Sequence, residues 1–299
     1  MKTQVKTKLT TSGAFTGAQA YTVEGYGAHY IEMDWAGFVA GLSGDAAAKL
    51  TGMAADMYSR YGTDLRKHLK DTPMDDFTSM DSLRDKLDAT LMADMRDRIK
   101  RKKVDTWDGS DLEIDTIINR RGIPFSERRK QSKPRPVLVI AQRLAHTFTA
   151  GGVHAWNAAQ GLWLSEYFTS KGYDIEFYAY TDHMDKDRLP SDERGRVLTS
   201  VKLKGRGDRL YHEILRRALA DRKVYQASWW PMRAITGTPW ATAYGHYQHR
   251  TGKYFDQFSW AQGAKCINLP LAYNEQECIS NIQAVLNNDQ RFVSDNRDS

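Results

Sequence analysis

The pattern of apolar positions is clearest between Arg135 and Thr181. Residues 137–140 are a short apolar run rich in β-branched side chains, which predicts a strand. After residues 151–152, a glycine pair, large apolar residues recur at helical spacing until Gly172, and glycine is a common helix stop. Residues 174–180 form a second β-rich run. The stretch predicts a strand, a helix and a second strand, and the scarcity of polar residues in the strands favours a parallel sheet covered on both faces.

Other elements are predicted on both sides of this unit. Before it, apolar residues at helical spacing predict two helices within residues 35–70 and another at about 79–101, whereas residues 112–118 fit an edge strand or a short helix. After it, the pattern predicts a strand at 197–204, a glycine loop with a helix at 205–222, a return to the sheet at 224–229 and a helix at about 274–287. The last residues look frayed.

Together these elements predict an α/β fold with a mostly parallel sheet flanked by helices. We expect a flexible arm at residues 1–20, an N-terminal helical part at 21–119 and a basic linker at 120–135. The remainder, 136–299, is expected to be the α/β domain with an aromatic C-terminal extension.

Composition limits the classes of protein that fit. No apolar run approaches the length of about 18 residues that a membrane-spanning helix needs, and the first residues contain no apolar signal core. The two cysteines do not make a disulfide framework. We therefore expect a cytoplasmic protein with no membrane partner. The net charge of +6 favours phosphate-bearing polymers as partners, although a basic protein without such a partner fits as well.

Two stretches resemble the von Willebrand factor A-like family, whose Rossmann-like sheet occurs in adhesion receptors, chelatase subunits and ring-shaped RNA-binding particles. The first is VLVIAQRLAHTFTAGG (137–152), where the family has a buried strand followed by an Asp-x-Ser-x-Ser loop. The second is GRGDRLYHEILRRALAD (205–221), which resembles the Gly-Gly-Thr-Asp loop of the family and its following helix. The resemblance covers roughly residues 134–230 and implies the same sheet.

The metal ligands of that family are missing from this chain. A hard divalent cation needs carboxylate and hydroxyl ligands. Ala141 and Gln142 stand where the first loop supplies an aspartate, with Arg143 beside them, and Gly207 stands where the second supplies a threonine. Residues 224–230 contain no aspartate either. We expect no metal and no cofactor.

A third stretch, GGVHAWNAAQGLWLSEYFTSKGYDIEFY (151–178), is similar to tailed-phage proteins with such a degenerate domain. Lytic podoviruses of one group encode a small single-stranded DNA-binding protein that recruits the phage RNA polymerase. The resembling phage proteins have no assigned activity, but the size and charge of this chain fit a protein of that kind, and we expect a phage transcription or replication accessory factor in the host cytoplasm.

No pattern in the chain specifies an enzyme. The glycine-rich stretches lack the lysine and the serine or threonine of a phosphate-binding loop. His246 and His249 with Cys266 and Cys278 do not have the spacing of a compact zinc module. No serine or cysteine lies on a recognisable strand–turn–helix elbow, and no acidic pair suggests a general acid and base. We therefore expect a binding protein.

Single-stranded nucleic acid is held by basic side chains combined with aromatic platforms on which bases stack. The most basic stretch is 120–135, and residues 228–255 interleave aromatic and basic side chains. The side chains predicted to contact phosphates are Arg120, Arg121, Arg128, Arg129, Lys130, Lys133, Arg135, Arg143, Arg206, Arg233, Arg250 and Lys253. The side chains predicted to stack on bases are Trp229, Trp230, Tyr244, Tyr247 and Tyr254.

Two plainer interpretations stay open. Residues 120–135 also fit a solvated linker, and an apolar cap over the sheet would be equally aromatic. We expect a non-enzymatic binder of single-stranded DNA or RNA. The alternative is a protein-interaction scaffold or structural phage protein that uses a metal-free domain edge and in which the charge is incidental.

Overall fold

The structure is a computed structural model. It describes residues 6–9, 15, 17–23, 28–42, 78–91, 104–106, 111–112, 125–127, 135–145, 151–184, 196–208, 210, 212–221, 224, 227, 252–262 and 265–295.

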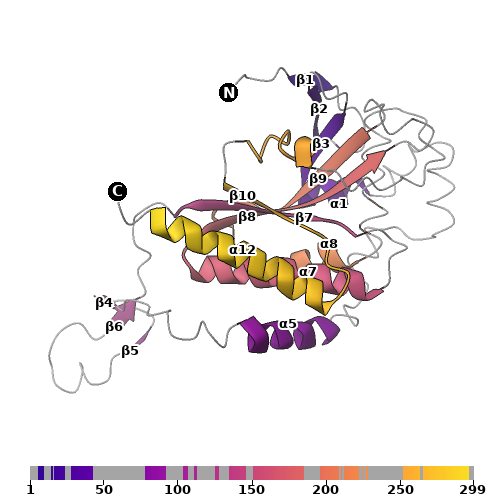
Figure 1. The fold of residues 1–299 in the computed structure, drawn as a ribbon. Helices are drawn as coiled ribbons and strands as arrows, with labels where there is room; N and C mark the ends of the chain where they lie inside the picture. The colour runs from indigo at the N-terminus through magenta and orange to yellow at the C-terminus, as the bar shows by residue number, and fades with distance from the viewer. Residues whose placement is uncertain are drawn as a thin grey trace.

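Seven strands form one mixed sheet in the order β1-β2-β3-β9-β8-β7-β10 (Figure 1). They are β1 (Lys6–Leu9), β2 (Gln19–Val23), β3 (His29–Asp34), β7 (Val137–Arg143), β8 (Asp174–Met184), β9 (Arg196–Lys204) and β10 (Lys265–Leu269). The pairs β10–β7, β7–β8 and β3–β9 are parallel. The pairs β1–β2, β2–β3 and β8–β9 are antiparallel.

The α/β class is therefore confirmed, whereas the expectation of a mostly parallel sheet is wrong. The predicted strand at 197–204 exists, but β9 runs antiparallel to β8. The physical reason is the short connection between them, residues 185–195, because a parallel crossover usually needs a dozen or more residues.

The N-terminal region also differs from the prediction. Residues 6–9 and 19–23, placed in an arm and at the start of a helical part, are strands of the main sheet, and β3 pairs with β9 far along the chain. Side chains on β2 and β3 alternate between the two apolar clusters, with Ala20 and Ile31 in one and Tyr21 and Tyr30 in the other. β1 and β2 are short, and β3 joins the rest of the sheet through β9, far along the chain, so local patterns gave little sign of these strands.

Helices cover one face of the sheet. α7 (Gly151–Ser170) packs on the strands, and α5, α8 and α12 surround it, with α5 outermost in Figure 1. The other helices on this face are α1 (Trp35–Gly41), α5 (Thr78–Leu91), α8 (His212–Ala220) and α12 (Glu275–Asp295). Because α7 is covered on all sides, its apolar residues are not confined to one stripe.

The predicted strand–helix–strand unit is confirmed. α7 joins the parallel strands β7 and β8, and Gly172 follows its end with a φ of +89°, which only glycine adopts readily. The amide of Gly172 donates to the carbonyl of Thr169 at 3.0 Å, and that of Tyr173 to Phe168 at 3.0 Å. These bonds satisfy carbonyls at the helix end.

A short aromatic segment covers the other face of the sheet. Residues 252–262, which we call the strap, include α11 (Gly252–Phe255). The ring of Trp260 stacks on Tyr178 with 4.3 Å between centroids, and its indole nitrogen donates to the Ser200 hydroxyl at 3.0 Å. The Glu32 carboxylate accepts from the Tyr21 hydroxyl at 2.5 Å and from both the amide and the hydroxyl of Ser259. The strap thus forms the second core of the domain.

The C-terminal part contains an element that the sequence analysis missed. β10 pairs with β7, whereas Val224 and Ala227, placed in a returning strand, are helical. A buried amide network links β7, α7 and the turn before α12, since the Asn157 side chain bonds the amide and the carbonyl of Ala272, both at 3.0 Å. The predicted last helix is confirmed as α12, which continues to Asp295 rather than fraying from residue 287.

A second, antiparallel sheet has the order β4-β6-β5. Its strands are β4 (Val104–Thr106), β5 (Asp111–Leu112) and β6 (Phe125–Glu127). The remaining expectations for residues 43–77, 92–103, 113–124 and 228–251 lie outside the described residues.

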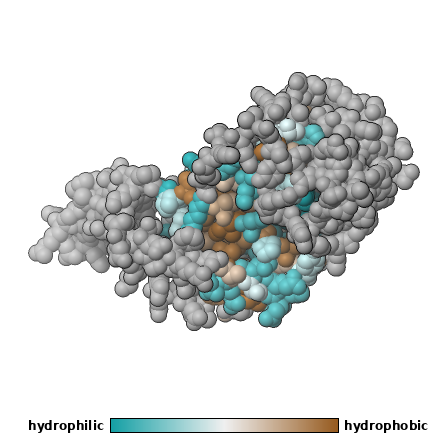
Figure 2. Space-filling model, turned by 45° about the horizontal axis from the view of Figure 1, so that its top comes forward, coloured by the Kyte–Doolittle hydropathy of each residue, from teal (hydrophilic) through white to brown (hydrophobic). Residues whose placement is uncertain are grey.

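The described part of the surface mixes residue types. In Figure 2 apolar residues gather near the middle of the coloured band and hydrophilic residues flank them. Among the described residues, Tyr273 is a large hydrophobic side chain that is exposed, at 49%. No helix in the described ranges has the length and apolar character required to cross a membrane.

Candidate nucleic-acid interface at the amino edge of the sheet

Basic side chains gather at one edge of the main sheet. The parallel strands β10, β7 and β8 begin at this edge, and β9 ends there because it runs antiparallel to β8. We call it the amino edge. The basic residues at this edge are Arg135 before β7, Lys171 before β8, Lys202 and Lys204 near the end of β9, Arg206 in the following loop and Lys265 at the start of β10.

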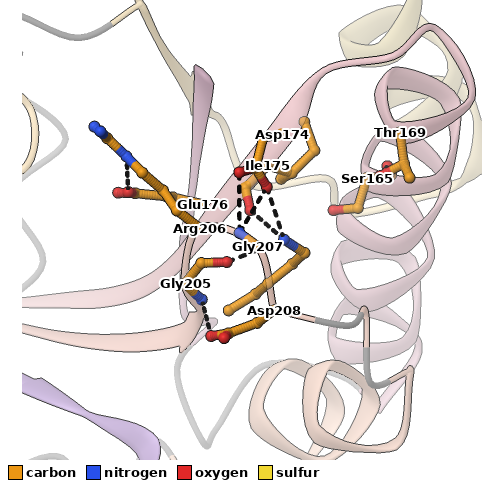
Figure 3. Close-up of polar contacts among 10 residues, drawn as sticks. Ser165, Thr169, Asp174, Ile175, Glu176, Gly205, Arg206, Gly207 and Asp208 are labelled. Atoms are coloured by element: carbon orange, nitrogen blue, oxygen red, sulfur yellow. Dashed lines mark hydrogen bonds and ion pairs between the residues drawn. The ribbon is translucent and has the colours of Figure 1, made fainter. Parts of the chain in front are cut away.

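The acidic residues at the amino edge already have partners inside the protein. Asp34 caps α1 by accepting from the amide of Gly37 at 2.6 Å. Asp174 accepts from the amide of Gly207 at 2.9 Å, and Asp208 accepts from that of Gly205 at 2.9 Å (Figure 3). These bonds place three carboxylates against backbone donors.

The fourth acidic residue is Glu176 on β8. Its carboxylate accepts from the Arg206 guanidinium at 2.6 Å and from the Tyr178 hydroxyl at 3.1 Å. Burial raises the pKa of Tyr178, and the neighbouring Glu176 charge raises it further, so this hydroxyl stays protonated and donates. Arg206 is 63% exposed, so it is shared between Glu176 and solvent.

The loop after β9 is shaped by these contacts. Gly207 has a φ of +69°, in the left-handed region, and its amide points at the Asp174 carboxylate. Lys204 turns inward, where its ammonium donates to the carbonyls of Ile175 at 2.6 Å and Gly205 at 3.1 Å. Lys204 is therefore a structural cation, and the loop holds Arg206 at the surface.

Three further cations at this edge are exposed and form no ion pair with a described residue: Arg135, Lys171 and Lys202. The Lys171 ammonium lies 5.2 Å from the centre of the Tyr167 ring, and that of Lys202 lies 5.9 Å from Tyr178. Lys265 lies over Tyr173 at 5.5 Å. Because the basic residues named at the amino edge outnumber the acidic ones, six to four, the described part of this edge carries an excess of positive charge.

The predicted basic linker enters the sheet at this edge. Arg135 is exposed and comes two residues before the start of β7. The predicted contacts that lie outside the described residues are Arg120, Arg121, Arg128, Arg129, Lys130, Lys133, Trp229, Trp230, Arg233, Tyr244, Tyr247 and Arg250, together with the side chain of Lys253.

Two predicted contact residues do not lie on an exposed surface. Arg143 is 8% exposed and ends β7 at the opposite edge of the sheet. Tyr254 is 2% exposed, and the Arg196 guanidinium lies 3.9 Å from the centre of its ring. Arg196 is itself buried in a two-bond pair with Asp182, at 2.8 and 3.0 Å. The ring of Tyr254 is therefore core, and neither residue belongs to the amino edge.

The two stretches that resemble the von Willebrand A-like family lie apart. Residues 137–143 end at the carboxyl edge, where the amide of Leu144 donates to the carbonyl of Tyr180 at 2.8 Å. Residues 205–208 lie at the amino edge against Asp174. Residues 144–145 and residues 205–208 therefore lie at opposite edges of the sheet.

The cysteines also lie on opposite faces of the sheet. Cys266 packs against the aromatic cluster under the strap, and Cys278 lies in the core on the helix face. Burial raises the pKa of each thiol to about 12, which disfavours the thiolate that metal binding and nucleophilic attack require. The described residues contain no group of three or more metal-ligating side chains, and His246 and His249 lie outside them.

Sequence reasoning missed Lys171, Lys202 and Lys265 as members of a common surface. The three lysines lie in separate segments, and only the strand order brings them to one edge. A usable signal was present only for Lys171, which lies three residues before the predicted strand at 174–180.

Comparison with known proteins gives no further guidance: no protein-family model matches the chain, and no curated protein or solved structure shows significant similarity to it.

Proposed function

We propose that this protein binds single-stranded nucleic acid, with phosphates held along the amino edge of the sheet. The observation that carries the proposal is the exposed set Arg135, Lys171 and Lys202, beside which the carboxylates are occupied by backbone donors and Arg206. A surface of this kind attracts a polyanion and releases its counterions.

The basic linker extends the surface in this proposal. Arg135 joins the amino edge directly to residues 120–133, which carry six further basic side chains in the sequence: Arg120, Arg121, Arg128, Arg129, Lys130 and Lys133. A basic segment that directly precedes a basic edge in the sequence suits a flexible single strand, whose backbone can contact both. Stacking of bases is assigned to Trp229, Trp230, Tyr244 and Tyr247, and no longer to Tyr254.

The proposal makes a first testable prediction about binding. A fluorescent single strand of about 20 nucleotides, longer than common single-strand site sizes, is expected to bind the full chain at low salt and to resist competition by duplex of the same sequence. Fluorescence anisotropy measures both. Because phosphate contacts supply the affinity, the variant Arg135→Gln with Lys171→Gln and Lys202→Gln should bind at least about tenfold more weakly.

A matched control comes from a lysine away from the amino edge. The side chain of Lys86 on α5 is 60% exposed, and its Nζ atom lies 3.8 Å from Oε2 of Glu275. Glu275 is the first residue of α12, near the carboxyl edge of the sheet. Lys86→Gln changes the net charge by one unit but should leave binding nearly unchanged. Absence of binding by the unaltered chain at low salt would contradict the proposal, and so would an equal loss in the control.

The resemblance to degenerate von Willebrand A-like phage proteins gives this proposal a context. It suggests an accessory factor of phage transcription or replication whose protein partner is an RNA polymerase. The separation of the two resembling loops means that a shared metal-type loop site carries no part of the proposal.

A further inference from the structure

Two buried threonine hydroxyls on the helix face of the sheet form no hydrogen bond with the described part of the chain. Thr181 on β8 and Thr199 on β9 are directly opposite each other in the antiparallel register, and each is 1% exposed. The Oγ1 atoms of both are buried without a partner among these residues. A buried hydroxyl without a hydrogen bond costs free energy, so such groups in folded proteins usually bond to another group or to an internal water.

The strand register places both hydroxyls on the face covered by helices. Ala179 and Val201, opposite each other and two residues further along the strands, belong to the core on that face, as do Ile31 and Val197. Side chains along a strand alternate between faces, so Thr181 and Thr199 project into the same apolar core. Opposed side chains on antiparallel strands have Cβ atoms about 4.5–5.5 Å apart, which leaves both hydroxyls within reach of one small molecule.

A further buried polar atom lies on β3, on the other side of β9. His29 begins β3 opposite Val197 of β9, and the next residue of β3 on that face, Ile31, is opposite Thr199. The Nδ1 atom of His29 is buried and forms no hydrogen bond with a described residue. Burial lowers the pKa of His29, so the ring is neutral and offers one donor and one acceptor.

The surroundings favour an uncharged ligand. The core residues Ala179, Val197 and Val201 beside the threonines on this face are apolar, and the buried side chains of Arg196 and Asp182 pair with each other through two hydrogen bonds. Residues 196 and 182 alternate with 197 and 181, so this pair projects to the opposite face. An ion would therefore meet no opposite charge from the described residues at this corner.

We propose that Thr181 and Thr199 hold one internal water molecule between their hydroxyls. A buried water makes about two to four hydrogen bonds to polar groups that otherwise have none, and the two hydroxyls supply two of them.

The test is a double-mutant cycle with Thr181→Val, Thr199→Val and the double variant, followed by urea unfolding. Valine keeps the shape of threonine but removes the hydroxyl. If a water bridges the pair, each single change lowers the urea midpoint, because it removes a bond to the water and leaves the other hydroxyl poorly satisfied. The second change then costs less than the first, since the water is already lost.

Thr199→Ser serves as the matched variant that keeps the hydroxyl, and it should lose less stability than Thr199→Val if the hydroxyl matters. A crystal structure at a resolution that shows ordered waters should contain a density peak between the two Oγ1 atoms. An empty site together with raised midpoints for the valine variants would overturn the proposal, because unsatisfied hydroxyls that bind nothing are better replaced by methyl groups.

Discussion

His29 illustrates how the burial of one side chain links the fold to pH. Its pKa is lowered from 6.5 because burial disfavours the charged ring. Above pH 6.5 the ring is neutral in the folded and unfolded chains, so it contributes nothing to the pH dependence. Below 6.5 the unfolded chain takes up a proton that the folded chain resists. The free energy of unfolding therefore falls as pH decreases, until the folded-state pKa is reached.

We predict that His29→Gln removes this part of the acid destabilisation. Urea unfolding between about pH 5 and 7 should show a pH slope that is less steep for the variant, by at most about 1.4 kcal/mol per pH unit, the value for one proton. The comparison is made between slopes, so an equal loss of stability at every pH does not affect it. Identical slopes for the two proteins would contradict the prediction.

At the scale of elements, one side chain connects three parts of the helix face. Asn157 on α7 accepts from the side chain of Gln142 on β7 at 3.1 Å and bonds both backbone groups of Ala272 in the turn between β10 and α12. Gln160, one turn later, donates to the carbonyl of Pro270 at 3.1 Å, and Asn281 on α12 donates to Gln160 at 3.0 Å. This buried amide network fixes the start of α12 against α7.

Asn157→Ala is predicted to destabilise the protein strongly. The change leaves the amide and the carbonyl of Ala272 and the side-chain nitrogen of Gln142 without this partner in a buried place, at about 1–3 kcal/mol for each unsatisfied group. A total loss of about 3 kcal/mol or more is expected from urea unfolding. Gln283→Ala, an exposed change on α12, should stay within about 0.5 kcal/mol. A loss for Asn157→Ala as small as that control would show that the network is not formed.

The elements that could be predicted from sequence are those that local patterns determine. α7 and its glycine stop are encoded within a continuous stretch, and so are β7 and β8. β1, β2 and β10 are short, and β10 pairs with β7, far back in the chain, so local sequence gives little indication that they are strands. The direction of β9 likewise depends on its pairing with β8 and β3, which its own sequence does not reveal.

The candidate site, too, could be predicted only where local sequence determines it. Arg135 and Arg206 were predicted from local basic composition, and both are exposed at the amino edge. Arg143 and Tyr254 carry the same chemistry in the sequence, but a buried strand end and the strap place them in the interior. Burial depends on what covers a residue, and composition around that residue does not reveal it.

At the scale of the whole molecule, the net charge is +6, and exposed basic side chains gather at the amino edge of the sheet. At the amino edge the carboxylates are turned to backbone donors and to Arg206 and Lys204, whereas Arg135, Lys171 and Lys202 face solvent. The linker with the highest basic density in the sequence enters the sheet at the same edge. A polyanion approaching the protein should therefore be drawn to this edge, and its binding should depend on salt.

The most direct test of this account is the salt dependence of single-strand binding. The logarithm of the binding constant is measured against the logarithm of salt concentration for the unaltered chain, for the combined variant Arg135→Gln, Lys171→Gln and Lys202→Gln, and for Lys86→Gln. Each phosphate contact on a single strand contributes about 0.7 to the slope, so the combined variant should have a slope smaller by about 2, while the control should match the unaltered chain. Equal slopes for all three proteins would contradict the account and assign the binding surface to another part of the molecule.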